Sequence, residues 1–321
     1  LPGEVAFQIA SYLNLKLRFV IFIMQIFFYS LYLFLIYQFF KKIKINVVIL
    51  FAIFSPIFLI YHIAELEVLA RKEIFLFIGY LWFYFISKNE NNVNKSIIWI
   101  ILILPIVSIL YEPALFYYPF FAAVVILKMR SENIQKILFT LFLIFIPSVI
   151  VSWFSAFTLI SPDGFEIMKN SLSEKFGESC YMSCGLMDTK REATTHIIAT
   201  INKLTEKDNS IFIYLFRYFL IMLFGFAPLI ILIKNSVINI SFFNFKLLVL
   251  PFLLLNILVP FHWLMFIDWG RAVNITYVSS LLFFFYLYQN NFIKTNFKLV
   301  EKKFNQIFDW LKNKTFLKSK K

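Results

Sequence analysis

Three short charged segments interrupt an otherwise apolar sequence, and their residue types could bind a phosphorylated substrate. "ARKE" (70–73) contains Arg71 and Lys72, "YEP" (111–113) contains Glu112, and "DWGR" (268–271) places Asp268 and Arg271 three residues apart. Arginine and lysine bind phosphate oxygens, and arginine does so with a bidentate fork. A carboxylate in a partly desolvated cleft can act as a general base. These segments therefore supply candidate phosphate ligands and candidate catalytic carboxylates.

Each candidate also has a purely structural interpretation. Glu67 and Arg71 stand at i, i+4 spacing and can pair on a helix or in a solvated loop. Asp268 and Arg271 can neutralise each other within a turn, and Glu112 can be an ordinary turn residue. Arginines near a helix end can also extend to the lipid headgroups. The set of segments is therefore more informative than any single member.

Arg217 is a further candidate because it lies inside an apolar segment. In "NSIFIYLFRYFLIMLFG" it follows Ser210 by seven residues, which corresponds to about 10 Å along a helix. At that depth the guanidinium must extend outward or meet an anion or water between helices. We therefore include Arg217 among the candidate phosphate ligands.

The composition requires that these residues be positioned by membrane helices. Of the 321 residues, 61% are hydrophobic and only 15% are charged, whereas soluble domains carry about 25% charged residues. A helical span needs about 20 mostly apolar residues. We find nine apolar runs: 17–40, 45–64, 74–86, 97–111, 114–127, 137–160, 211–233, 247–267 and 274–288.

These runs predict an all-α polytopic membrane protein with about nine transmembrane helices. The chain opens without a Met, and an additional helix before residue 1 would give ten or more. We predict one transmembrane domain over 1–288 with an external loop at 161–210, followed by a basic amphipathic cytoplasmic tail at 289–321. The spacing of apolar residues between 297 and 311 favours a helix lying on an anionic leaflet, against the alternative of a solvated coil.

Charge indicates the orientation of the chain. If residue 1 is outside and the loops alternate, the inner segments hold most of the 31 Lys and Arg residues but only four acids, Glu90, Glu132, Glu301 and Asp309. Cytoplasmic loops are enriched in Lys and Arg, so the net charge of +13 is explained by topology and does not indicate a nucleic-acid partner. The three charged segments, Arg217 and His262 then gather at the outer helix ends, where they could converge on one cavity.

The external loop contains both cysteines, Cys180 and Cys184. In an oxidising compartment they could form a short disulfide, and zinc binding with His196 is only weakly indicated by the irregular spacing. "SPDGFE" (161–166) is typical of a turn and helix start. The chain shows no Walker-type loop, GxSxG, HExxH or dinucleotide-binding pattern. We therefore predict no cofactor and no metal.

The many aromatic-rich spans, the late external loop and the segments "ARKE", "YEP" and "DWGR" resemble those of bacterial O-antigen and capsule polymerases and related polyprenyl-phosphate-sugar-dependent (GT-C) glycosyltransferases. The resemblance implies an inner-membrane enzyme that acts on polyprenyl-diphosphate-linked oligosaccharide, alongside other polysaccharide-assembly proteins. It implies that Arg71, Arg217 and Arg271 hold the diphosphate and that Glu112 or Asp268 is the base. GT-C enzymes carry a catalytic acid in the first external loop, where this sequence retains only Glu4.

The alternative function is a transporter or flippase for a lipid-linked or small solute. Such proteins bind substrate near the middle of the membrane, beside broken helices. Proline residues within the spans, including Pro56, Pro147 and Pro228, could supply such breaks. The lack of acids and bases in the middle of the spans counts against ion coupling through charged groups.

Overall fold

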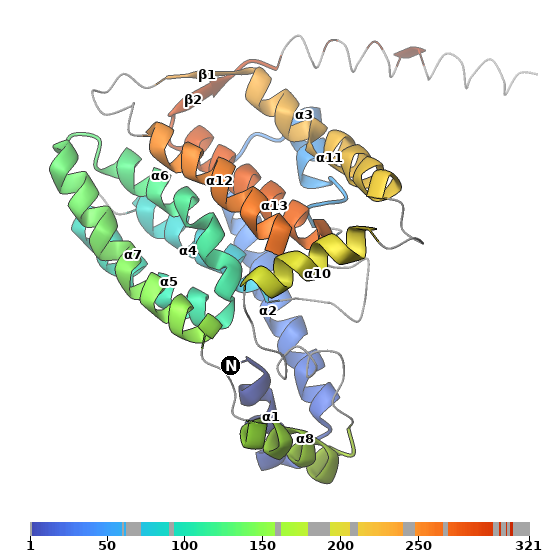
Figure 1. Ribbon diagram of the computed structural model, residues 1–321. Helices are drawn as coiled ribbons and strands as arrows, with labels where there is room; N and C mark the ends of the chain where they lie inside the picture. Colours follow the sequence, from blue (N-terminus) through green and yellow to red (C-terminus); the bar gives the residue numbers. More distant parts are fainter. Residues whose placement is uncertain are drawn as a thin grey trace, which may run out of the picture.

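The computed structural model describes residues 2–59, 61, 72–89, 93–157, 162–178, 193–205, 211–239, 248–265 and 269–297, with single residues 302, 306, 309 and 310. Its elements, in order, are α1 (Pro2–Leu13), α2 (Leu17–Phe40), α3 (Val47–Ile53), α4 (Glu73–Asn89), α5 (Val93–Leu110), η3 (Glu112–Tyr117), α6 (Tyr118–Lys128), α7 (Ile134–Phe157), α8 (Pro162–Phe176), α10 (Ala193–Thr205), α11 (Ile211–Lys234), β1 (Ser236–Ile238), α12 (Val249–Met265), α13 (Trp269–Gln289) and β2 (Ile293–Thr295). Figure 1 shows their arrangement.

The helices confirm the predicted class of an all-α membrane protein. Four of them are long and apolar enough to cross a membrane: Leu17–Phe40, Val93–Leu110, Ile134–Ser155 and Leu215–Lys234. A shorter apolar helix covers Val249–Met265. Most of the other predicted runs also coincide with helices, but the total of nine spans stays a prediction.

Helix α13 forms the centre of the bundle. Most of its residues from Ala272 to Tyr286 are buried, and it contacts α4, α6, α11 and α12. In Figure 1, α5 and α7 lie at one flank of the bundle, and α3 and α11 lie at the opposite flank. Aromatic rings fill the space between α4, α6 and α13: Tyr80 and Phe121 are stacked with centroids 4.2 Å apart, and Tyr84 and Tyr286 are tilted with centroids 4.9 Å apart. This core fixes the position of the α13 N-terminus.

A small two-stranded antiparallel sheet of β1 and β2 was not predicted from the sequence. We call this strand pair the hairpin, although α12 and α13 lie between its strands in the chain. Ser236 pairs with Thr295 and Ile238 with Ile293, so the hairpin joins the segment after α11 to the segment after α13. We refer to this end of the bundle as the hairpin end. Nearby, Lys88 Nζ donates to Gln289 Oε1 at 2.6 Å, and Gln289 Nε2 donates to Phe39 O at 2.8 Å.

The predicted span 45–64 is wrong as one continuous helix, because α3 ends at Ile53. Pro56 has no backbone N–H, so it cannot donate to Ala52 O as the residue four positions later would in a helix. Tyr277 Oη donates to Ala52 O instead, at 2.8 Å. Residues 56–59 form turns, in which Ile57 O and Leu59 O accept hydrogen bonds from side chains of α13 and α2. We call residues 54–59 the α3 break.

Within its described residues, the external loop predicted at 161–210 contains the two helices α8 and α10. α8 begins at Pro162, as "SPDGFE" predicted, and ends before Gly177, whose φ of 63° suits glycine at a helix C-terminus. α8 packs with α1 and the start of α2 at the end opposite the hairpin (Figure 1), whereas α10 contacts α11 and α12. Cys180 and Cys184 lie outside the described residues, as does most of the predicted tail helix.

Candidate functional site

A buried ion pair joins the first turns of α4 and α13. Arg271 Nε lies 3.5 Å from Glu73 Oε1, and the side chain of Glu73 is 0% exposed while that of Arg271 is 36% exposed. Glu73 suits its position because a carboxylate is favoured at the positive end of a helix dipole, whereas Arg271 at the start of α13 is disfavoured there. The carboxylate thus compensates both the guanidinium charge and its unfavourable position.

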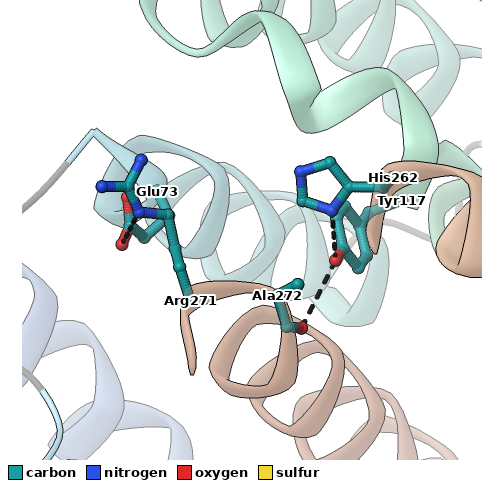
Figure 2. Close-up of polar contacts among 5 residues, drawn as sticks. All are labelled: Glu73, Tyr117, His262, Arg271 and Ala272. Carbon is teal, nitrogen blue, oxygen red and sulfur yellow. Dashed lines mark hydrogen bonds and ion pairs between the residues drawn. The ribbon is translucent and has the colours of Figure 1, made fainter. Parts of the chain in front are cut away.

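A second buried pair lies on the other side of the first turn of α13 (Figure 2). Tyr117 Oη is 3.1 Å from His262 Nδ1 and 3.5 Å from Ala272 O. When the hydroxyl donates to Ala272 O, the Nδ1–H of His262 donates to the hydroxyl oxygen. The imidazole is 3% exposed and stacks on Phe116 with a centroid distance of 5.1 Å, so its orientation is fixed.

Local packing explains why α12 and α13 bring these groups together. Trp269 Nε1 donates to Trp263 O at 2.9 Å, which ties the first residue of α13 to the end of α12. The two indole rings lie 6.2 Å apart, and Tyr218 of α11 packs edge-on against Trp269. Arg271 and His262 are therefore positioned by the same short connection between the two helices.

A wide apolar groove extends from this site towards the hairpin end. It has a volume of about 1000 Å³ and is lined by α11, α12, α13, one residue of α6 and the hairpin. Trp263 and Thr276 line it near the site, and Ser236, Ile238 and Ile293 line it at the hairpin end. Along α11 the lining runs from Phe219 to Ile233, which corresponds to about 21 Å of helix. The groove is lined by apolar residues with a few neutral polar ones, and the Glu73–Arg271 pair lies outside it, on the turn of α13 that precedes the lining residue Thr276.

The structure separates the predicted site residues into three places. Arg271 meets Glu73 as described, and Lys72 is an exposed turn residue immediately before α4. Glu112 is half-buried at the start of η3 and accepts from Ser155 Oγ of α7 at 3.2 Å. Arg71 and Asp268 lie outside the described residues, so their predicted roles stay predictions.

Arg217 is exposed on α11 and points away from the groove. It lies nine residues before Phe226, which lines the groove, and this interval is two and a half helical turns. The two side chains are therefore on opposite sides of α11. Of the two arginines predicted to form a diphosphate clamp that the structure describes, neither lines the groove: Arg271 lies nine residues before the groove-lining Ser280 on α13, the same interval that separates Arg217 from Phe226 on α11.

Three residues of the site, Glu73, Tyr117 and His262, were not among the predicted catalytic or phosphate-binding residues, although His262 was expected at the outer helix ends. Glu73 belongs to "ARKE". Its position at the start of an apolar helix could have identified it, because an acid that is buried there requires a partner. Tyr117 carries no such signal, because it is one of 16 tyrosines in an aromatic-rich chain. Only the packing of η3 against α12 distinguishes it.

Within the described residues, no group of three or more His, Cys, Asp or Glu side chains could hold a metal ion. Comparison with protein-family models, curated proteins and solved structures found no match for this chain.

Proposed function

We propose that the protein is a membrane glycosyltransferase or polymerase that acts on polyprenyl-diphosphate-linked sugars at the outer face of a bacterial inner membrane, in the synthesis of a surface polysaccharide. The observation that carries this proposal is an apolar groove of about 1000 Å³ along helix α13, whose first turn carries the Glu73–Arg271 pair. A lipid-linked sugar diphosphate has an anionic head and a long apolar tail, and these two features match the two parts of the site.

In the proposed reaction a carboxylate takes the proton of an acceptor sugar hydroxyl. The hydroxyl oxygen then attacks the anomeric carbon of the donor sugar, and the bond from that carbon to the diphosphate oxygen breaks. Polyprenyl diphosphate leaves with the bonding electron pair, and Arg271, with Arg71 and Lys72, stabilises its negative charge. Glu112 and Asp268 are the proposed bases.

Reconstitution with a bacterial lipid-linked oligosaccharide tests the proposal, with chain extension followed on gels. We expect Arg271→Ala to lower the rate by about 100-fold or more, the usual effect of removing a group that stabilises developing charge. Arg18→Ala is the matched control, because Arg18 is 83% exposed and pairs with Glu178 at the α1–α8 end of the molecule. Chain extension that survives the combined loss of Arg217, Arg271 and Glu112 would contradict the proposed site.

The groove is tested in the same assay. Leu255→Trp places a bulky ring among the groove-lining residues, so we expect a higher KM for the lipid-linked donor with a smaller change in kcat. Ile257→Trp is the control, because Ile257 is 66% exposed on the same helix. Equal effects of the two substitutions would exclude the groove as the binding site of the tail.

A transporter or flippase is the second candidate function, and the α3 break favours it. Transporters bind their substrates beside broken helices whose irregular backbone is enclosed by protein. In vesicles containing a labelled lipid-linked sugar, movement of the label across the bilayer without chain extension would support this candidate over the enzyme.

A further inference from the structure

The α3 break is an oxygen-rich polar region inside an otherwise apolar bundle. Ser55 Oγ donates to Gly225 O at 3.2 Å, Asn274 Nδ2 donates to Ile57 O at 2.8 Å, and Tyr29 Oη donates to Leu59 O at 3.3 Å. The bonds to Ile57 O and Leu59 O, together with the bond from Tyr277 to Ala52 O, satisfy carbonyls that a continuous helix would satisfy internally, whereas Ser55 ties the break to the backbone of α11.

Asn274 has an acceptor that these bonds do not use. Its side chain is 0% exposed, and among the described residues Oδ1 has no hydrogen-bond partner although Nδ2 is bonded. A buried amide oxygen without a partner is strongly disfavoured. A bound group that donates hydrogen bonds or carries positive charge would satisfy it.

We propose that the α3 break binds an alkali-metal cation through Asn274 Oδ1 and neighbouring oxygens of the break. The groups identified at the break are neutral carbonyl, amide and hydroxyl oxygens, which are the ligands that hard cations prefer and which unwound membrane helices offer to Na⁺. They include no carboxylate that would balance a divalent charge, so the site selects a monovalent ion. The proposal does not depend on whether the protein is an enzyme or a transporter.

The position of Asn274 gives the site a connection to the Glu73–Arg271 pair. Asn274 follows Arg271 by three residues, so the two lie nearly one turn apart on α13. The break itself is held against α11, because a Cβ on Gly225 would lie 2.7 Å from Ile57 Cδ1. A cation here would therefore stabilise the contact of the break with both α11 and α13.

Thermal unfolding of the purified full chain in detergent tests the site, with the fluorescence of the six Trp residues as the signal. The protein is prepared in choline chloride, and NaCl or KCl is exchanged in at constant ionic strength. We expect a saturable rise in Tm of several degrees with either alkali cation, because a ligand that binds only the folded state stabilises it. Superimposed curves in choline and alkali salts would leave a water molecule as the partner of Oδ1 and overturn the proposal.

Two substitutions and a control locate the effect. Asn274→Leu should abolish the rise in Tm, whereas Asn256→Leu should keep it, because Asn256 is exposed and bonds its own helix at Phe252 O. Asn274→Asp should shift saturation to at least tenfold lower cation concentration, since it adds a negative charge, and it provides the test if Asn274→Leu does not fold. A response of Asn274→Asp that equals that of the wild type would contradict the assignment to Asn274.

Discussion

At the scale of single residues, the Glu73–Arg271 pair is asymmetric. The side chain of Glu73 is completely buried, whereas that of Arg271 is 36% exposed and has a long flexible stem. Removing the arginine leaves a carboxylate in the interior without this guanidinium, but removing the carboxylate leaves an arginine that can extend towards water. The two halves of the pair should therefore contribute differently to stability.

We predict that Arg271→Met destabilises the protein by about 3–5 kcal/mol, the cost of breaking a buried pair on one side. Glu73→Gln should cost less, about 1–3 kcal/mol, because a neutral amide keeps hydrogen-bonding capacity. Thermal unfolding in detergent measures both. A larger loss of Tm for Glu73→Gln than for Arg271→Met would show that Arg271, not Glu73, is the group that depends on the pair.

The partner of Arg271 could not be deduced from the sequence. The local spacing pointed to Asp268, three residues away, which lies outside the described residues, whereas the contact that the structure shows joins Arg271 to Glu73 of α4. Local patterns report which residues share a turn or a helix face, whereas a contact between distant segments depends on how the helices pack. For the same reason the sequence offered no sign that Tyr117 would meet His262.

At the scale of elements, the apolar runs predicted most of the helices, because a helix that crosses a membrane must contain about 20 mostly apolar residues in a row and such a run is visible in the sequence. The run 97–111 became α5 and 211–233 became α11. The run 45–64 failed because its residues are apolar throughout, so only Pro56 marked the end of α3. The hairpin was missed because strands of three residues are too short to show a period of two.

The contact of α11 with the α3 break gives a prediction at this scale. Gly225→Ala would place its Cβ 2.7 Å from Ile57 Cδ1 and 3.2 Å from Ile57 Cγ1, so we expect a loss of about 1–3 kcal/mol from overpacking. Thermal unfolding measures this loss. Gly3→Ala is the control, because a Cβ there would meet no atom within 4 Å.

A double substitution tests the cause. Ile57→Ala should remove most of the penalty of Gly225→Ala, because it deletes the atoms that the new methyl group meets. Simple addition of the two single losses would show that another contact is responsible.

At the scale of the whole molecule, the two ends of the bundle differ in composition and structure. The hairpin end carries Lys88 and Lys294, whereas the opposite end carries α1 and α8. The sequence predicts the basic end to be cytoplasmic.

Cysteine labelling in intact cells tests this orientation. After mild reduction, we expect a membrane-impermeant maleimide to label Cys180 and Cys184, which are the only two cysteines of the chain. A Lys294→Cys substitution in a cysteine-free background should be labelled only after the membrane is permeabilised. Labelling of position 294 in intact cells would invert the predicted topology.

The β1–β2 hairpin has a mechanical consequence for the groove. Its strands hold the ends of α11 and α13 at a fixed separation, so one wall and the floor of the groove cannot part at that end. Helix α12 has no strand pairing in the described part of the chain, and any widening of the groove must therefore displace α12. Because α12 carries His262 near its other end, an occupant of the groove that displaces α12 would also shift the imidazole relative to Tyr117.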